Sequence, residues 1–328
     1  MSGGAPEPAA RVAGGILPLR AVDSSLESLN ELIERGPRFW EEVRRAAEET
    51  GPALAADEAE PVLPVRITDY VDCYASLEHA TNIGRMFRPD EPLLPNWRRL
   101  PVAYHGRAST VVVSGTDVVR PHGQVDGHLR PTHALDFECE LGFVCGPSTR
   151  VGEHVPIDEA AERIFGFVLL NDWSARDVQA FEYVPLGPFL GKSFATSISP
   201  WIVPASDLPR AAPRAQDPAP DAYLRAADPW TVDLDIEVAI DGRVVARCNP
   251  RWLYWTPAQM LAHATVNGAA LTAGDLFGTG TISGTEPGQL GCLLERFGGG
   301  RWLADGEEVV MRSDALGEVR GRVLPAAR

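Results

Sequence analysis

Two carboxylates stand two positions apart, at Glu138 and Glu140. The surrounding segment 137–144 alternates between apolar and other residues, which is typical of a β-strand. In a strand, residues i and i+2 share a face, which puts these carboxylates about 7 Å apart on one side of a sheet. Such a pair repels itself unless it faces water or a cation. The pattern therefore leaves two interpretations open, a solvated strand face or a hard-cation site with oxygen ligands.

A further acidic residue, Asp172, stands between a predicted buried strand and a predicted helix. It follows the apolar run 165–170 and precedes the helix that we expect over about 174–181. Aspartate at such a junction is either the N-cap of the helix or another carboxylate ligand for a cation. The residue type alone leaves both interpretations open.

Three side chains downstream of this aspartate could stabilise negative charge. Arg176 and Gln179 are three residues apart on the predicted helix and therefore share a face. Lys192 lies in the apolar run 188–194, which is rich in glycine and proline and is not typical of a solvated lysine. Cationic and amide donors of this kind, placed near a metal, suit a developing oxyanion or carbanion.

A histidine near the start of the main domain is a candidate general base. His79 follows the acidic and aromatic segment 69–74, and imidazole is the side chain best suited to take a proton near neutral pH. A lone histidine is more often structural or exposed, and residue type alone does not exclude that. Asn82 and Gly84 predict irregular backbone around it.

Other familiar catalytic motifs are missing from the sequence. The glycine-rich segment 278–284 lacks the Gly-Lys-Ser/Thr of a P-loop and the third glycine of a dinucleotide fingerprint. Neither a Gly-x-Ser-x-Gly nucleophile elbow nor a His-Glu-x-x-His zinc motif occurs. The five cysteines form no Cys-x-x-Cys pair, so we expect free buried thiols in a reducing compartment rather than a zinc cage or a disulfide framework.

The charge balance of the chain bears on its partners. Of 328 residues, 45 are acidic and 30 are basic, for a formal net charge of −15. A surface of this sign repels nucleic-acid phosphates and anionic lipids, so we expect neither nucleic acid nor membrane as a partner. A small acidic substrate remains possible, because a local cationic pocket can lie inside an acidic protein. No stretch approaches about 18 unbroken apolar residues and no signal-peptide pattern occurs, so we expect a cytoplasmic protein.

The chain is predicted to divide into a short N-terminal segment, 1–61, and a main domain, 62–328. The segment begins with an expected flexible tail over 1–15. A capping box at 24–27 predicts a first helix, and Pro37 predicts the start of a second. An Ala-, Pro- and Glu-rich linker follows the second helix.

The main domain shows mostly strand and turn patterns. Asp241-Gly242, between two β-rich segments, predicts a hairpin, and Asp305-Gly306 repeats the pattern. Helices are few, and the clearest begins at Thr256 as a cap. The sum is a mixed α/β, β-rich domain with long connections. The expected strands are 110–119, 137–144, 232–240 and 243–248, and the expected helices are 157–164, 174–181 and 257–266.

Several long motifs of this chain resemble the fumarylacetoacetate hydrolase family, and they occur in the expected order from about residue 62 to the C-terminus. The Glu-x-Glu and Asn-Asp-Trp-Ser pieces are shared by the wider superfamily, whereas the runs at 104–107 and 183–189 are typical of its fumarylacetoacetase branch. The motifs are Asp72-Cys73-Tyr74, His79-Ala80-Thr81-Asn82, Pro95-Asn96-Trp97, Tyr104-His105-Gly106-Arg107-Ala108-Ser109, Glu138-Cys139-Glu140, Asn171-Asp172-Trp173-Ser174-Ala175-Arg176-Asp177, Gly280-Thr281-Ile282-Ser283-Gly284 and the run from Tyr183 to Phe194.

The resemblance implies a β-roll-like fumarylacetoacetase C-terminal domain fold, preceded here by a short helical N-terminal segment, and a homodimer. Better-known members of the family carry a longer N-terminal domain of small β type. About 60 residues with two predicted helices stand in its place in this chain. That difference leaves the motif residues untouched and concerns the dimer geometry and the outer edge of the site.

The resemblance also implies roles for individual residues. His79 would activate water, oriented by Glu295, and Arg176, Gln179 and Lys192 would stabilise a departing carbanion. The ligands of a catalytic Ca²⁺ or Mg²⁺ would be Asp72, Glu138, Glu140 and Asp172, with Lys192 and Thr196 joining Asp172 at a second ion. The substrate contacts would be Tyr74, Arg88, Tyr104, Gln179, Tyr183 and Thr281.

The reaction implied is the metal-dependent hydrolysis of a carbon–carbon bond in a small acidic 1,3-diketone. The leading substrate is fumarylacetoacetate, cleaved to fumarate and acetoacetate in tyrosine and phenylalanine catabolism. One alternative is an acylpyruvate hydrolase or a 2-oxo acid decarboxylase on the same scaffold. Another is a non-catalytic binding protein, which would predict the loss of His79, Glu295, Lys192 or a metal carboxylate, and all are present.

Overall fold

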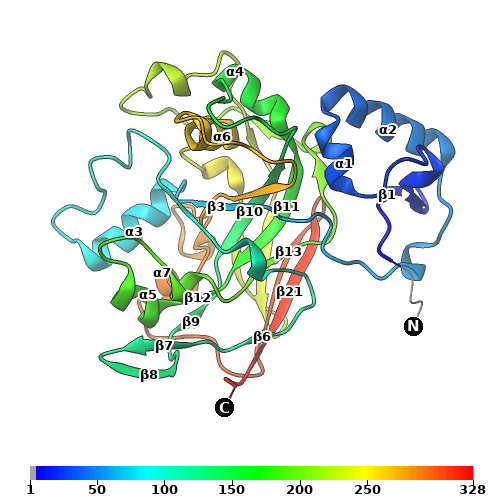
Figure 1. Cartoon of the computed structure of the whole chain (residues 1–328). Coiled ribbons are helices and arrows are strands. Elements are labelled where there is room, and N and C mark those ends of the chain that lie inside the picture. Colours follow the sequence, from blue (N-terminus) through cyan, green and yellow to red (C-terminus); the bar gives the residue numbers. More distant parts are fainter. Residues whose placement is uncertain (1–4, 328) are drawn as a thin grey trace.

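Two packed β-sheets form the centre of the structure, a computed structural model that describes residues 5–327 (Figure 1). The strands β10 (Cys139–Cys145) and β11 (Ile164–Asp172) are buried along almost their whole length. Since such strands are apolar on both faces, they lie in the middle of the larger sheet. In order across that sheet come β4 (Ala103–His105), β3 (Tyr70–Cys73), β19 (Asp275–Gly278), β10, β11, β13 (Thr196–Ile198) and β5 (Val111–Val113), and β14 (Val203–Pro204) also pairs with β11.

The smaller sheet packs against the larger one and closes the main core. Its strands in order are β18 (Arg243–Cys248), β17 (Ile236–Ile240), β20 (Glu308–Ser313), β21 (Gly317–Leu324) and β6 (Val118–Val119). Phe143 and Phe167 of the larger sheet share one apolar cluster with Val238 and Met311 of the smaller sheet. The mixed α/β, β-rich prediction is confirmed, because strands provide this core and the few helices lie around it.

Short strand pairs and helices complete the described chain. The pairs are β1 (Ala9–Val12) with β2 (Gly15–Pro18), β7 (His122–Val125) with β8 (His128–Pro131), β9 (Leu135–Asp136) with β12 (Ser174–Ala175), and β15 (Arg210–Ala211) with β16 (Thr231–Val232). The helices are α1 (Leu29–Glu34), α2 (Pro37–Thr50), α3 (Leu77–Phe87), α4 (Ile157–Ala160), α5 (Arg176–Glu182), α6 (Pro257–Thr265) and α7 (Leu293–Phe297). In Figure 1, α3, α5 and α7 gather on one side of the sheets.

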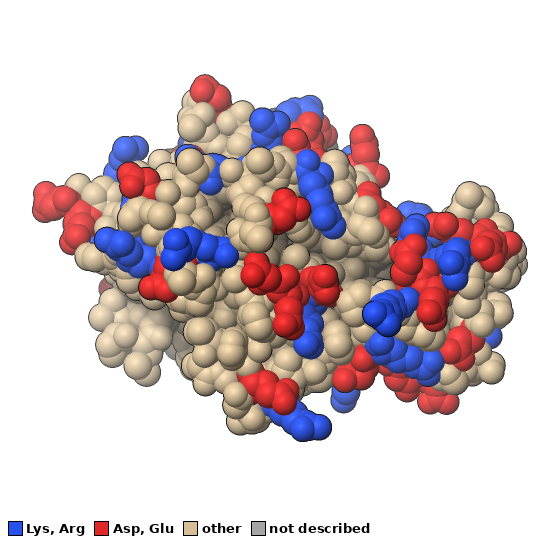
Figure 2. Space-filling model, turned by 90° about the horizontal axis from the view of Figure 1, so that it is seen from above, with Lys and Arg blue, Asp and Glu red and all other residues tan. Residues whose placement is uncertain are grey.

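The N-terminal segment forms a lobe on the opposite side from those three helices (Figure 1). Helix α2 begins at Pro37 as predicted. The edge-to-face contact of Trp40 with Phe165, at 5.1 Å between ring centroids, ties the lobe to the larger sheet. In the space-filling view the lobe projects to the right, with acidic and basic side chains interspersed over its surface (Figure 2).

Two details of this segment differ from prediction. The expected flexible tail over 1–15 contains β1 and the start of β2, which pair as a hairpin, and residues 1–4 lie outside the described chain. The first helix begins at Leu29 rather than after a capping box at 24–27, because Ser28 accepts the backbone N–H of Glu31. The Glu31 carboxylate in turn accepts the N–H of Glu27, so the capping contacts form one turn later than predicted.

The strand predictions in the main domain are right in type, and β18 has the predicted bounds, but two other predicted strands are wrong in extent. The Asp241-Gly242 hairpin is confirmed, with both residues at positive φ as a tight hairpin turn requires. The strand expected over 110–119 is two short strands in different sheets, β5 and β6, separated by a turn in which Gly115 has φ 93°. The strand expected over 232–240 is interrupted, because Asp233 and Asp235 accept hydrogen bonds from Asn249.

The backbone around His79 is helical, and the expected irregularity is wrong. Ser76 caps α3 by accepting the N–H of His79. Gly84 lies within α3, where the carbonyl of Pro92 approaches so closely that a Cβ would lie 1.9 Å from it. The glycine therefore reflects close packing of the following loop rather than a break in the helix. No helix within residues 5–327 is long and apolar enough to cross a membrane.

Candidate functional site

Four buried carboxylates gather on one face of the larger sheet. Asp72 on β3, Glu140 on β10 and Asp172 at the end of β11 each lie on the face opposite the main core, and Glu138 immediately precedes β10. Carboxylate oxygens from all four lie within 4.8 Å of one another, and each residue is at most 5% exposed. The solvated-face interpretation of Glu138 and Glu140 is therefore wrong. Asp172 is a strand residue, and Ala175 occupies the N-cap position of α5.

Cations from two other elements neutralise part of this charge. The Lys192 ammonium donates to Glu138 Oε2 at 2.7 Å and to Asp172, while Arg176 Nη1 donates to Glu138 Oε1 at 2.6 Å. Thr196 on β13 donates to Asp172 Oδ1 at 2.9 Å. Burial alone would raise the pKa of Glu138, but Lys192 and Arg176 hold it far below its usual range. Lys192 is the only lysine in the chain.

Two oxygens of the cluster have no such partner. Tyr104 donates to Asp72 Oδ2 at 2.6 Å, and the N–H of Gly280 donates to Glu140 Oε2 at 2.9 Å. Asp72 Oδ1 and Glu140 Oε1 are buried with no hydrogen-bond donor among the described residues. Burial and the neighbouring carboxylates raise the pKa of both groups well above the usual range. Unpartnered buried carboxylate oxygens in an all-oxygen set fit a hard divalent cation.

A glycine makes room for these oxygens. Gly278 on β19 is paired with Asp72 on one side and with Gly142 on the other. A Cβ at Gly278 would lie 2.7 Å from Glu140 Oε2 and 2.9 Å from Asp72 Oδ1. Since real Cβ atoms do not approach so closely, a side chain at this position would displace both carboxylates.

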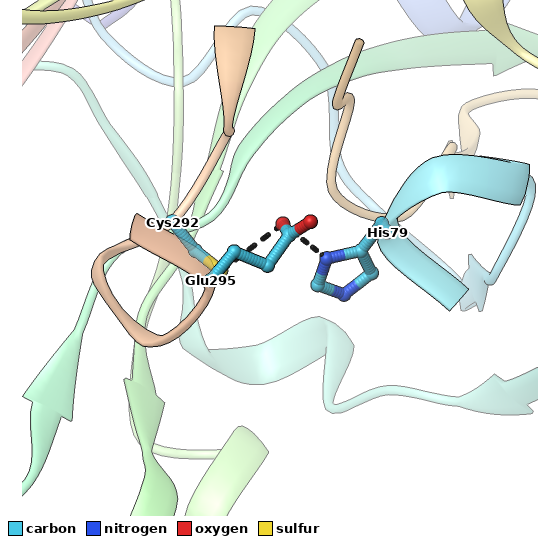
Figure 3. A group of neighbouring side chains, drawn as sticks. All are labelled: His79, Cys292 and Glu295. Carbon is cyan, nitrogen blue, oxygen red and sulfur yellow. Dashed lines mark hydrogen bonds and ion pairs between the residues drawn. The ribbon is translucent and has the colours of Figure 1, made fainter. Parts of the chain in front are cut away.

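His79 and Glu295 form a buried pair (Figure 3), and His79 lies close enough to Glu138 of the carboxylate cluster to help lower its pKa. Nδ1 of His79 on α3 lies 2.5 Å from Oε2 of Glu295 on α7. Asn82 donates to Glu295 Oε1 at 2.9 Å and Ser283 donates to Oε2 at 2.7 Å. Burial would raise the pKa of Glu295, but His79 and these donors lower it. With Nδ1 held by a carboxylate, Nε2 is the ring nitrogen that can exchange a proton with a ligand.

A third residue in this group is Cys292, whose Sγ lies 3.4 Å from Glu295 Oε2 (Figure 3). Its thiol is buried, and burial together with the charge of Glu295 raises its pKa well above the usual range. A protonated thiol is a weak donor and a poor metal ligand, so Cys292 supports the carboxylate rather than completing a zinc site. All five cysteines are free and buried, which agrees with prediction.

The candidate substrate contacts fall into two groups. Tyr74 packs edge-on against the His79 ring at 5.3 Å between centroids, and Tyr104 reaches the carboxylate cluster. Thr281 Oγ1 and Arg88 Nε are buried without a hydrogen-bond partner in the described chain, and the Gln179 amide oxygen lies 3.5 Å from Arg176. Tyr183 differs, because it is 42% exposed at the end of α5, and its hydroxyl makes no hydrogen bond to these residues within 5–327; only its backbone N–H bonds to the carbonyl of Gln179.

Sequence reasoning missed two buried groups at this site. Tyr70 lies on β3 two residues before Asp72, and its hydroxyl has no hydrogen-bond partner in the described residues. Asp136, which is fully buried, accepts a hydrogen bond from Arg176 Nε at 2.9 Å. The available signal was the two-residue period, which places Asp136, Glu138 and Glu140 at alternate positions of one segment.

The chain is similar to known proteins over most of its length. The family model described as "Fumarylacetoacetate (FAA) hydrolase C-terminal" matches residues 69–324. A fumarylacetoacetase from Caenorhabditis elegans is 48% identical over 308 residues, which cover 83% of this chain and 74% of that protein. One from Arabidopsis thaliana is 42% identical over 359 aligned positions, covering 94% of this chain and 85% of that protein.

A solved structure extends the similarity to the fold. An HpcE protein from Mycobacterium smegmatis has a TM-score of 0.70 and 23% identity, covering 97% of this chain and 96% of that one. At this identity the likeness concerns the fold alone. Together with the family model and the close sequence relatives, it places the observed sheets and helices within one fold family. The chain belongs to the fumarylacetoacetate hydrolase family.

Proposed function

We propose that this protein hydrolyses fumarylacetoacetate to fumarate and acetoacetate. The observation that carries the proposal is the buried His79–Glu295 pair beside four carboxylates, in a chain 48% identical to a fumarylacetoacetase. A protein that had become a non-catalytic binder would have no reason to keep a buried carboxylate beside an imidazole, because burying a carboxylate is costly. The reaction belongs to the degradation of tyrosine and phenylalanine.

The four carboxylates would hold Ca²⁺ or Mg²⁺, whose ligand preference is oxygen. Asp72 and Glu140 offer unpartnered oxygens for it, while Lys192 and Thr196 would join Asp172 at a second ion. When bound, a divalent cation acts as a Lewis acid on the oxygens of a 1,3-dicarbonyl.

His79 and Glu295 would move the proton that starts hydrolysis. Nε2 of His79 accepts a proton from water while Nδ1 stays bonded to Glu295, whose charge favours the resulting imidazolium. The water oxygen bonds to the ketone carbon of the fumaroyl group, which becomes the second carboxylate carbon of fumarate. The carbon–carbon bond then breaks, its electron pair stays with the acetoacetate carbon, and a proton completes that product.

Other side chains would bind the substrate and stabilise the departing carbanion. Arg176, Gln179 and Lys192 supply cationic and amide donors for the developing charge. Arg88 suits a substrate carboxylate, because a guanidinium can bind it through two hydrogen bonds. The remaining substrate contacts proposed are Tyr74, Tyr104, Tyr183 and Thr281.

The wider organisation is part of the same proposal. We expect a cytoplasmic homodimer in which residues 62–328 form the catalytic domain and residues 1–61 an attached lobe. The five free buried thiols fit a reducing compartment. Sedimentation of the purified protein measures the oligomeric state directly.

The deciding experiment follows the loss of diketone ultraviolet absorbance when purified protein meets fumarylacetoacetate, with and without a chelator. Wild type with Ca²⁺ or Mg²⁺ is expected to consume the substrate, and His79→Ala is expected to be inactive. His263→Ala serves as the matched control, because His263 on α6 bonds to Tyr223 and contacts no site residue named above. No decay by metal-loaded wild type would contradict the assignment, and decay of an acylpyruvate instead would establish the alternative reaction.

A further inference from the structure

Asp136 connects two parts of the site that come from different elements. Its Oδ1 accepts the backbone N–H of Leu293 at 2.8 Å, and its Oδ2 accepts the N–H of Leu294 at 3.1 Å. Oδ2 also accepts Nε of Arg176 at 2.9 Å, and Oδ1 accepts the N–H of Phe137. The side chain is fully buried, so these four donors, rather than water, satisfy the carboxylate.

On one side, Asp136 caps the helix that carries Glu295. The N-cap residue of α7, Cys292, makes no capping bond with its side chain. The first N–H groups of a helix have no partner within the helix, so they need acceptors from elsewhere. The Asp136 carboxylate accepts the N–H groups of Leu293 and Leu294, the two residues directly before Glu295. The carboxylate therefore fixes the turn from which Glu295 reaches His79.

On the other side, Asp136 fixes the plane of a guanidinium. Arg176 is held at Nε by Asp136 and at Nη1 by Glu138. Because a guanidinium is planar, two anchored nitrogens define the position of the third. That third nitrogen, Nη2, is buried and has no hydrogen-bond partner in the described residues, so it is left free to donate to a ligand. The pairing of β9 with β12 places Asp136 opposite Ser174, two residues before Arg176, which makes this link short.

We propose that Asp136 is a positioning residue that holds Glu295 and Arg176 in register, so that the proton-accepting pair and the charge-stabilising guanidinium act on the same substrate. This role rests on the proposed hydrolysis. Asp136 touches neither the reacting atoms nor the cation. It acts through Arg176 and Glu295, which take part in the proposed reaction. Loss of the carboxylate leaves two helix N–H groups without acceptors and frees the Arg176 side chain to turn.

The kinetic test replaces Asp136 by asparagine, which keeps the shape but offers one acceptor oxygen in place of two. We expect Asp136→Asn to lower kcat at least 10-fold while KM and Ca²⁺ affinity change less than 3-fold, because it disturbs alignment rather than binding. Asp275→Asn is the matched control. Asp275 is also buried and accepts two backbone N–H groups, from Asp69 and Thr272, but it contacts neither Arg176 nor α7. Its kcat should stay within 2-fold of wild type even where its Tm falls.

A second readout needs no substrate. The short His79–Glu295 hydrogen bond should give a downfield proton resonance in the NMR spectrum, identified by its disappearance in His79→Ala. Asp136→Asn should shift or broaden this resonance, and Asp275→Asn should not. A variant that keeps the charge, Asp136→Glu, covers the case in which the asparagine variant does not fold. It keeps Arg176 paired but displaces the acceptors, so kcat and the resonance should both change.

A resonance unchanged in position and width in the folded Asp136 variants would overturn the role, as would an equal loss of kcat in Asp275→Asn. If wild type consumes no diketone at all, the proposed hydrolysis fails, and the resonance alone then decides whether Asp136 positions Glu295. The two proposals can therefore fail separately.

Discussion

His79 and Glu295 are 216 positions apart in the chain, and their buried side chains meet at 2.5 Å. The helices α3 and α7 bring them together, and Asn82 on α3 adds a second bond to the same carboxylate. The Glu295 carboxylate thus bonds to His79 and Asn82 on α3 and to Ser283 in a loop, and the Cys292 thiol is a fourth, weaker donor. A carboxylate held so firmly can fix the orientation of an imidazole.

Replacing Glu295 by glutamine should therefore slow turnover far more than it weakens substrate binding. The amide keeps the volume but removes the charge that favours protonated His79. General acid–base catalysis contributes about 10²–10⁴-fold, and we expect a loss of kcat within that range. Steady-state kinetics on fumarylacetoacetate measure it, with Glu286→Gln as an exposed control nearby. Retention of more than half of kcat would contradict a role in activating the base.

The same substitution should change how stability depends on pH. The pKa of Glu295 is lowered on folding from a usual value of 4.5, so its ionised form stabilises the native state above that value. This contribution is lost as the pH falls from about 4.5 through the lower, folded pKa. Glu295→Gln should thus be less stable than wild type at pH 7, and the difference between their free energies of unfolding should decrease in acid. Urea unfolding at pH 7 and pH 4 measures this difference, and a difference that increases in acid would contradict the prediction.

Binding of a divalent cation should release protons. Asp72 and Glu140 have pKa values raised well above the usual range, so without a cation the native state holds protons there up to a higher pH than the unfolded chain does, and its stability decreases as the pH rises through the raised pKa values. A cation takes the place of these protons. Calorimetric titration of Ca²⁺ at pH 7 should show heats that depend on the ionisation enthalpy of the buffer. Glu140→Gln should release fewer protons and bind more weakly, while buffer-independent heats would contradict the prediction.

Lys192 should not be replaceable by arginine. Its compact ammonium lies between Glu138 and Asp172, and a planar guanidinium cannot occupy the same space. Removing the charge in Lys192→Met leaves Asp172 without its cation, while Glu138 keeps Arg176, and loss of one partner of a buried pair typically costs about 3–5 kcal/mol. We expect both variants to lose activity, and the methionine variant to recover stability when Ca²⁺ is added. Urea unfolding with and without Ca²⁺ measures this, and wild-type stability of Lys192→Met without metal would exclude a structural charge role.

A methyl group at Gly278 should weaken cation binding while leaving the sheet intact. The added Cβ would lie within 2.9 Å of oxygens from Glu140 and Asp72. We expect Gly278→Ala to lose at least about 10-fold in Ca²⁺ affinity, the range seen when groups that support metal ligands are changed. Gly142→Ala is a matched control on the partner strand, because its Cβ would meet Val168 and other apolar side chains instead. Equal losses of affinity in both variants would show a general disturbance of the sheet.

Local patterns in the sequence determined much of this structure. The two-residue period placed Glu138 and Glu140 on one face, and Asp241-Gly242 marked its hairpin, because backbone geometry fixes both within a few residues. The same period underlies the positions of Asp72 and Asp172 on the cation-facing side of their strands. The limits of strands were less predictable. Asp233 and Asp235 bond to Asn249 rather than extend β17, and contacts of this kind depend on a distant partner.

Tertiary structure alone decided which polar groups are buried and which of them form hydrogen bonds and ion pairs with one another. Glu138 could as well have faced water, and only the packing of α5 and the approach of Lys192 enclosed it with cations. The two-residue period puts Asp136 on the face of Glu138 and Glu140, but its role depends on Arg176 and on α7, whose first residue lies 157 positions away. Sequence specifies the period of a strand, which is set by neighbouring residues. The free energy of burying a charge depends on the donors that surround it, and those are brought together only by the fold.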